Sequence, residues 1–123
     1  MLLIPNHLWV DKNKFYEVLN INEVTHIDAT PTFLDQYDLS KILNLKRVVF
    51  GGERLSTEVF DKISLSKDIK LINAYGPTEA TITSVVNLIE NGSLTIGCPI
   101  SNTRCYVLDR DLNPLPTGAI GEL

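Results

Sequence analysis

The chain has 123 residues, 44% of them hydrophobic and 21% charged, with a formal net charge of −4. This is the composition of an ordinary globular domain, and the acidic balance offers no electrostatic footprint for nucleic acid. No apolar run approaches the ~20 residues of a membrane span, and the stretch from Met1 to Trp9 lacks the basic start of a signal peptide. Two cysteines, Cys98 and Cys105, are too few for a disulfide scaffold. We therefore expect a cytoplasmic protein without a nucleic-acid or membrane partner.

Short apolar runs alternate with segments of helical spacing through the first part of the chain. Helix starts are marked by residues that cap well, namely Asp11, Thr30 before Pro31, and Ser56. The expected elements in chain order are a strand at 2–4, a helix at 11–21, a strand at 24–28, a short helix from 30 to 37, another short helix at 42–45, a strand at 47–50, a helix at 56–63 and a strand at 70–73.

Alternating helices and strands are typical of a parallel sheet, so the expected fold class is α/β. In such sheets ligands bind beyond the carboxyl ends of the strands. Three expected strand ends carry chemically useful groups: Asp28, the run Gly51-Gly52-Glu53, and residues 73–79. Together they predict one binding site at that edge of the sheet.

After Glu79 the pattern changes to short apolar runs separated by turn residues, which is typical of antiparallel or barrel-like strands. We therefore divide the chain into an α/β portion (1–90) and a truncated β-rich portion (91–123) of the same domain. The final Gly121-Glu122-Leu123 lies within what looks like a further strand. We expect both ends of the chain to be cuts through a larger fold.

The run Asn73-Ala74-Tyr75-Gly76-Pro77-Thr78-Glu79 is the most informative part of the sequence. Tyr75 can stack on a purine, and Gly76 lets the backbone approach a ligand without a Cβ in the way. Thr78 can donate a hydrogen bond to a phosphate oxygen, and the Glu79 carboxylate can bind a hard divalent cation. These groups suit a nucleotide with its metal ion.

The same run, with Gly51-Gly52-Glu53 before it and Gly121-Glu122-Leu123 after it, closely resembles the amino-acid adenylation domains of nonribosomal peptide synthetases. These domains belong to the adenylate-forming superfamily, together with acyl-CoA synthetases and luciferases. Residues 96–100 and 106–109 are similar to the segment that follows in the family. The resemblance implies that the chain is part of the large N-terminal subdomain of such an enzyme.

The resemblance implies a site for ATP and Mg²⁺. Thr78 is similar to the residue that contacts the α-phosphate and Glu79 to the magnesium-binding glutamate, so these two are the expected catalytic residues. Without that context, Thr78 would be interpreted as a helix cap and Glu79 as a first-turn carboxylate that favours the helix dipole. The expected nucleotide-binding residues are Gly52, Glu53, Arg54, Asn73, Ala74, Tyr75, Gly76 and Thr78, with Glu79 as the metal ligand. Glu53 and Arg54 would act mainly through their backbone atoms.

The family recognises its amino acid with a pocket of scattered positions. By resemblance, those present here are Asp28, Val49, Gly51, Ala74, Ile82 and Thr83. An alternative role for Asp28 is to cap the helix that follows, but Thr30 suits that role better. His26, on the same expected strand, is predicted to point to the opposite face and to be structural.

The implied function is the joining of an amino acid to ATP, which gives an aminoacyl adenylate and pyrophosphate. The acyl group would then pass to the phosphopantetheine thiol of a carrier domain. Pro77 favours this branch of the superfamily. An acyl-CoA or aryl-acid ligase is an alternative, although Asp28 argues against an acyl-chain substrate, and a non-catalytic nucleotide-binding module is another.

The family's phosphate loop, ribose-binding Asp and catalytic Lys have no counterpart in the chain. We therefore expect the isolated chain to be inactive. Its expected partners are the rest of the adenylation domain and a peptidyl-carrier domain.

Overall fold

The structure is a computed structural model that describes residues 4–64, 69–90 and 92–123. The strand expected at residues 2–4 falls almost wholly outside these ranges. Among the described residues, no helix is long and apolar enough to cross a membrane. In chain order the elements are α1 (Asn6–Val10), α2 (Lys12–Ile21), β1 (His26–Ala29), α3 (Pro31–Asp35), the 3-10 turn η1 (Leu39–Lys41), β2 (Arg47–Phe50), α4 (Thr57–Ser64), β3 (Lys70–Tyr75), the 3-10 turn η2 (Thr78–Ala80), β4 (Val85–Leu88) and β5 (Cys98–Pro99).

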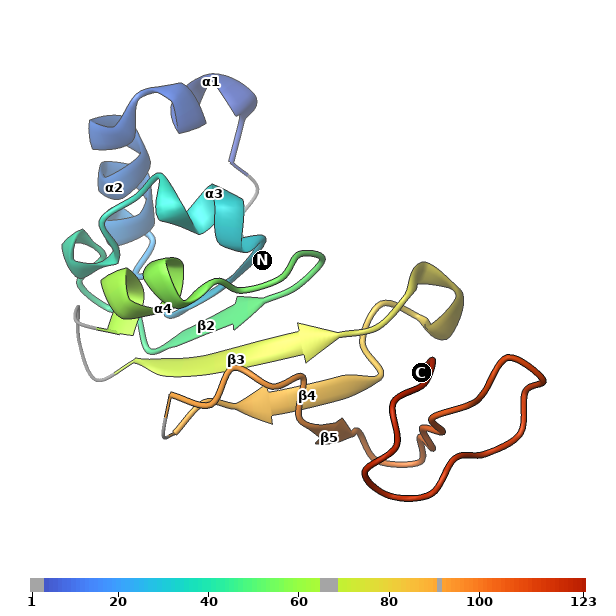
Figure 1. Cartoon of the computed structure of the whole chain (residues 1–123). Helices are drawn as coiled ribbons and strands as arrows, with labels where there is room; N and C mark the ends of the chain where they lie inside the picture. Colours follow the sequence, from blue (N-terminus) through green and yellow to red (C-terminus); the bar gives the residue numbers. More distant parts are fainter. Residues whose placement is uncertain (1–3, 65–68, 91) are drawn as a thin grey trace.

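The five strands form one sheet in the order β1-β2-β3-β4-β5 (Figure 1). β1, β2 and β3 are parallel, whereas β4 runs antiparallel to β3 and β5 runs antiparallel to β4. In the parallel part, Asp28 lies beside Val49 and Val49 lies beside Ile72. The mixed sheet confirms the expected α/β class, with parallel strands first and antiparallel strands after them.

The helices gather over one face of the sheet, and the core lies between them and that face (Figure 1). Val48 and Phe50 on β2, and Leu71 and Asn73 on β3, are buried there. They alternate with half-buried or exposed residues, because successive side chains of a strand point to opposite faces. The face that carries Asp28 is not covered by any of the four described helices.

Three helices begin at the caps that the sequence predicts. The side chains of Asp11 and Thr30 accept hydrogen bonds from backbone N–H groups in the first turns of α2 and α3. Ser56 Oγ accepts one from Val59 N at 3.4 Å, in the first turn of α4. Each bond satisfies a donor that has no partner within its own helix, which is why these residue types mark helix starts.

The helix expected at residues 42–45 is wrong, since the chain forms the η1 turn just before this run and a loop through it. The Asn20 side chain on α2 explains the difference. Its Nδ2 donates to Lys41 O at 2.9 Å and its Oδ1 accepts from Leu43 N at 2.8 Å. These bonds occupy backbone groups that a helix would use, while the loop still buries Ile42 in the core.

Helix α1 was not expected from the sequence. Trp9, near its end, packs edge-on against Phe33 with ring centroids 5.1 Å apart. The Tyr37 hydroxyl donates to Trp9 O at 2.9 Å. Burial raises the pKa of Tyr37, and the neighbouring Tyr16 adds to the effect. Contacts made by distant residues therefore hold this short helix, rather than its own five-residue sequence.

A tight loop joins β3 to β4, and Gly76 stands at its start. Ser84 N donates to Tyr75 O at 2.9 Å, and Ile82 N donates to Pro77 O at 3.3 Å. A Cβ on Gly76 would lie 2.6 Å from Ile82 O and 2.7 Å from Ser84 N, both of them backbone atoms. Only glycine allows the loop to fold back this closely.

Beyond β5 the chain continues as an extended segment that projects from the sheet (Figure 1). Leu108 forms antiparallel bridges with both Pro114 and Glu122. Leu108 N donates to Glu122 O at 2.7 Å, and Glu122 N returns a bond to Leu108 O at 2.9 Å. The antiparallel pairing expected for this part of the chain is confirmed.

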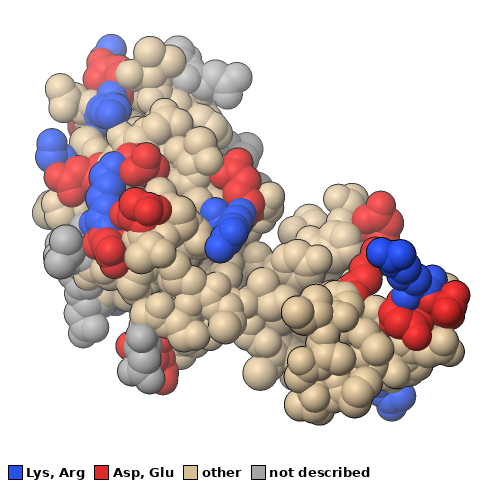
Figure 2. All heavy atoms as spheres, in the orientation of Figure 1, with Lys and Arg blue, Asp and Glu red and all other residues tan. Residues whose placement is uncertain are grey.

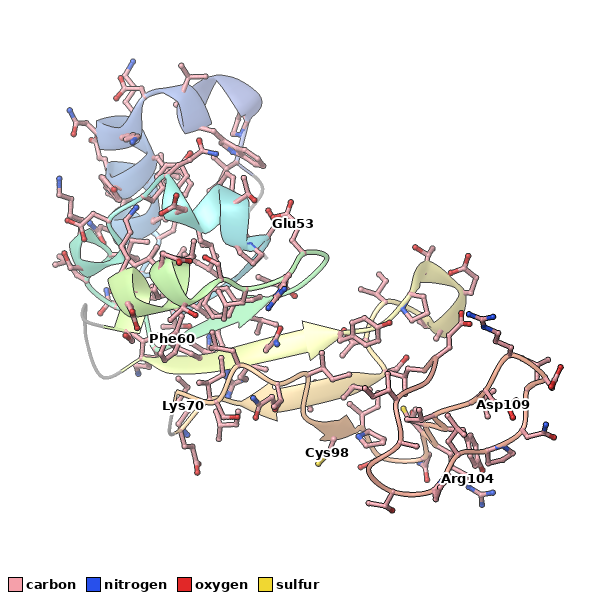
Figure 3. The ribbon with its side chains drawn as sticks, in the orientation of Figure 1. Glu53, Phe60, Lys70, Cys98, Arg104 and Asp109 are labelled. Carbon is pink, nitrogen blue, oxygen red and sulfur yellow. The ribbon has the colours of Figure 1, made fainter. Side chains whose placement is uncertain are left out.

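Asp109 directly follows Leu108 and organises the turn that leads to Pro114 (Figure 3). Its Oδ1 accepts hydrogen bonds from Asn113 N at 2.8 Å and from Asp111 N at 2.9 Å. The backbone bond from Asn113 is the main cause that holds the pKa of Asp109 below its ordinary value. The ionised carboxylate is therefore the form that this turn favours.

Gly76→Ala should loosen the β3–β4 loop, because the added methyl group overlaps backbone atoms that cannot move independently. We expect a destabilisation of about 1–3 kcal/mol. Hydrogen exchange followed by mass spectrometry over residues 77–84 should show faster exchange. Gly51→Ala is the matched control, since its Cβ would meet nothing closer than Ala74 O at 3.7 Å. Equal exchange in the two variants would contradict the steric argument.

The Asp109 turn should weaken in acid. Its folded pKa is lowered, so its contribution is complete above the unfolded pKa of ~3.9 and is lost as pH falls through the still lower folded value. A ¹⁵N–¹H titration should show the amide of Asn113 moving with a midpoint below ~3.9. Asp109→Asn keeps an acceptor oxygen but cannot titrate, so the movement should disappear. A midpoint above the ordinary value would overturn the assignment.

Candidate functional site

The three expected strand ends meet at one edge of the sheet. Because β1, β2 and β3 are parallel neighbours, Asp28 near the end of β1, the loop that starts at Gly51 after β2, and Tyr75 at the end of β3 come together. Figure 3 shows the Glu53 side chain at this edge, beside α3. The predicted convergence of these strand ends is confirmed.

A pocket of about 440 Å³ lies between the loop after β2 and the end of β3. This volume is in the range of small-molecule binding sites. Residues of the loop between β4 and β5 form a further wall. The pocket is lined by Gly52, Glu53, Arg54, Leu55, Asn73, Ala74, Tyr75, Gly76, Leu94 and Ile96.

Every residue expected to bind the nucleotide lines this pocket except Thr78. The sequence interpretation missed Leu55, Leu94 and Ile96. Leu94 and Ile96 are two residues apart, which places both side chains on one side of an extended segment. That spacing was the available signal, but it does not say which surface the segment covers.

The pocket offers a flat apolar surface. Tyr75 is 42% exposed, so its ring is accessible to a ligand. Leu94 and Ile96 add aliphatic surface to the same pocket. Gly52 has a φ of +79°, a conformation that allows the loop after β2 to turn at the pocket wall. A planar base that stacks on Tyr75 suits this arrangement.

Glu53 does more than the sequence interpretation assigned to it. Its Oε2 accepts hydrogen bonds from Thr32 N at 3.2 Å and from Thr32 Oγ1 at 2.5 Å. The carboxylate therefore ties the loop after β2 to the first turn of α3, where it also satisfies a free helical N–H. The expectation that Glu53 acts mainly through its backbone atoms did not include this side-chain contact. Arg54 is exposed.

Thr78 and Glu79 stand on the η2 turn, and both are exposed. Within the described part of the chain, no three His, Cys, Asp or Glu side chains gather as a metal site. The exposed Glu79 carboxylate is able to serve as one ligand of a divalent cation whose other ligands come from water or from a phosphate. Mg²⁺ is usually held in proteins by one or two carboxylates with substrate oxygens, so Glu79 fits that role.

The opposite face of the strand ends carries the residues expected to recognise the amino acid. Asp28 and Val49 are in register across β1 and β2. A Cβ on Gly51 would lie 3.7 Å from Ala74 O, so these two small residues are adjacent. Since Ala74 precedes Tyr75 by one residue, the two side chains point to opposite faces of β3.

Ile82 and Thr83 come from the β3–β4 loop rather than from a strand. Ile82 is 75% exposed and has a φ of +71°, whereas Thr83 is half-buried. The 440 Å³ pocket includes neither residue. The described structure thus brings Asp28, Val49, Gly51 and Ala74 to one side of the sheet edge and leaves Ile82 open to solvent.

Asp28 also lines a larger groove of about 1200 Å³ beside β1, an edge strand of the sheet that the described residues form. Within the described residues, its carboxylate has no hydrogen-bond or ion-pair partner. Thr30 caps α3, so Asp28 is not the cap of that helix. The prediction that His26 points to the opposite face is wrong, because residues two apart on a strand share a face. His26 instead shares a hydrogen bond with Thr25 Oγ1 at 2.7 Å.

Parts of known synthases are similar in sequence to this chain. N-(5-amino-5-carboxypentanoyl)-L-cysteinyl-D-valine synthase of Amycolatopsis lactamdurans is 37% identical over 99% of this chain, and the chain spans 3% of that relative. Bacitracin synthase 3 of Bacillus licheniformis is 43% identical over 81% of this chain, which spans 2% of it. The chain is therefore similar to a small part of much longer proteins.

Solved structures share the fold. The nonribosomal peptide synthetase FmoA3, in its form bound to alpha-methyl-L-serine-AMP, superposes with a TM-score of 0.77 at 24% identity, covering 90% of this chain and 14% of that one. PA1221, described as a protein containing adenylation and carrier (PCP) domains, superposes with a TM-score of 0.74 at 19% identity, covering 85% and 23%. All residues from 1 to 123 match the family model described as AMP-binding enzyme, and the chain therefore belongs to the AMP-binding enzyme family.

Proposed function

We propose that the chain is part of an amino-acid-activating adenylation domain that joins an amino acid to ATP. One observation carries the proposal: the pocket beside Tyr75 and the residues around Asp28 lie on opposite faces of the same strand ends. A nucleotide on one face and an amino acid on the other would meet at the edge between them. The similarity to peptide synthetases over nearly the whole chain supports this function.

In this reaction a carboxylate oxygen of the amino acid attacks the α-phosphorus of ATP. A new oxygen–phosphorus bond forms and the bond to the leaving pyrophosphate breaks. Tyr75 and the loop from Gly52 to Arg54 hold the adenine, and Thr78 donates to an α-phosphate oxygen. Glu79 would hold Mg²⁺, which when bound would supply positive charge to the phosphates. Most of the catalytic effect of these residues is positioning and charge neutralisation.

The aminoacyl group then passes to the phosphopantetheine thiol of a carrier domain. The combination of adenylation and carrier domains in PA1221 supports this partner. We propose a cytoplasmic location, where ATP is supplied and free thiols such as Cys98 and Cys105 stay reduced. In this scheme residues 1–90 and 91–123 are two portions of the same adenylation domain.

The direct test is amino-acid-dependent exchange of pyrophosphate into ATP by the full-length protein. Exchange that depends on one or a few amino acids is the expected result. A protein that binds ATP but shows no exchange with any amino acid would not be an amino-acid-activating enzyme.

Glu79→Gln should lower the exchange rate in the full-length protein, because the amide keeps the shape of the side chain and removes the charge that holds Mg²⁺. We expect a loss of roughly 10²-fold, or about 3 kcal/mol of transition-state stabilisation. The loss should be largest at limiting Mg²⁺. Glu17→Gln, an exposed position on α2, is the control and should leave exchange unchanged. Normal turnover of Glu79→Gln at limiting Mg²⁺ would remove Glu79 from the metal site.

The amino acid should carry a cationic or amide side chain. Asp28 is the ionisable group among the proposed pocket residues and is exposed in the described structure, so an apolar substrate would cover its carboxylate without giving it a partner. A pocket that pairs a polar group can reject analogues lacking it by roughly 10⁴-fold. Lysine, ornithine and glutamine should therefore exceed leucine, valine and phenylalanine in an exchange assay. Asp28→Asn should change this order, whereas Asp61→Asn, exposed on α4, should not. A wild-type preference for leucine, valine or phenylalanine would refute the assignment.

A further inference from the structure

Two asparagines face each other across β3 and β4 at the pocket. Asn73 and Asn87 are paired residues of this antiparallel ladder, so their side chains lie on the same face of the sheet. Asn73 is the buried polar residue of the core face and is only 8% exposed. Asn87 is half-buried and is not among the residues that line the pocket.

Both side chains bind the loop that connects β4 to β5. Asn73 Nδ2 donates to Thr95 O at 3.0 Å, and Asn87 Nδ2 donates to the same oxygen at 3.1 Å. Asn87 Nδ2 also lies 2.7 Å from Ser93 O and 3.3 Å from Thr95 Oγ1. The Thr95 carbonyl therefore links the two asparagines, and Asn87 supplies three of the four hydrogen bonds that their side chains donate to the loop.

The seated loop supplies one wall of the pocket. Leu94 and Ile96, on either side of Thr95, line the pocket that Tyr75 also lines. At Gly97 the loop passes so close to β4 that a Cβ would lie 2.0 Å from Val86 O. The position of this wall therefore depends on the hydrogen bonds of Asn87, a residue that does not itself line the pocket.

The same bonds decide how the Asn73 amide is turned. Its Nδ2 donates to Thr95 O, and the flipped amide would place Oδ1 against that carbonyl, where two acceptors repel. The polar atom that Asn73 can offer to a ligand is therefore Oδ1, an acceptor. It can pair with the exocyclic amino group of adenine, whereas guanine has a carbonyl oxygen at the corresponding position.

We propose that Asn87 is a positioning residue of the nucleotide pocket, which holds Thr95 so that the Asn73 amide presents its oxygen and Leu94 and Ile96 form the pocket wall. This inference rests on the proposed ATP-binding function. Asn87 acts through Thr95 and Asn73, without touching the nucleotide. Its loss should weaken ATP binding and should reduce the preference for adenine over guanine.

The experiment measures the dissociation constants of ATP and GTP by calorimetry, using the full-length protein and two variants. Asn87→Ala removes the three donated bonds. Asn87→Asp keeps the side-chain shape but cannot donate, and its carboxylate would face the carbonyl oxygens of Ser93 and Thr95. In both variants ATP should bind roughly tenfold more weakly, and the ratio of the GTP to the ATP dissociation constant should fall. A partly unfolded variant lowers the binding stoichiometry but does not change that ratio.

Asn113→Ala is the matched control, since it removes an asparagine bond in the Asp109 turn, away from the pocket. It should keep the wild-type constants for both nucleotides. Wild-type affinity and wild-type selectivity in both Asn87 variants would overturn the positioning role while leaving the proposed function intact. If the wild-type protein bound no ATP, the proposed function and this inference would both fail, which separates the two results.

Discussion

The site depends on one geometric constraint, the alternation of side chains along parallel strands that end at the same edge. The carboxyl ends of β1, β2 and β3 lie together at this edge. Successive side chains of β3 point to opposite faces of the sheet. Tyr75 lies on the helix-covered side, whereas Ala74 lies on the side of Asp28 and Val49. A shift of the register by one residue would exchange the two sets, so the strand register is part of the geometry of the candidate site.

Contacts between the helices and the sheet also position the walls of the candidate site. The side chain of Glu53, in the loop after β2, accepts hydrogen bonds from the first turn of α3. The position of that helix therefore also determines where this loop, one wall of the pocket, lies. The opposite wall is held from β3 and β4 through Thr95. Figure 2 shows charged side chains on the helices and on the C-terminal segment, with an uncharged stretch between them. Asn73 is the buried polar residue at the pocket among those that the structure describes, and its side chain is hydrogen-bonded.

Much of the fold was predictable because its signals are local. Caps at Asp11, Thr30 and Ser56 act within one helical turn, and the strand at Arg47–Phe50 has the bounds expected from its apolar run. The failures have non-local causes. Asn20 takes up backbone groups of a loop more than twenty residues away in sequence, which prevents the expected helix. No pattern within the short apolar run indicates that contact.

The sequence by itself determined the α/β class, the strand ends that carry the site and most of the pocket-lining residues, because residue type and periodicity encode local conformation. The tertiary structure decided what comes from elsewhere in the chain. Leu94 and Ile96 join the pocket because their loop folds back over β3 and β4, and Asn87 gains its proposed role because it is paired with Asn73. These relations depend on strand pairing and loop closure, which bring together residues that are distant in sequence, so no local pattern can specify them.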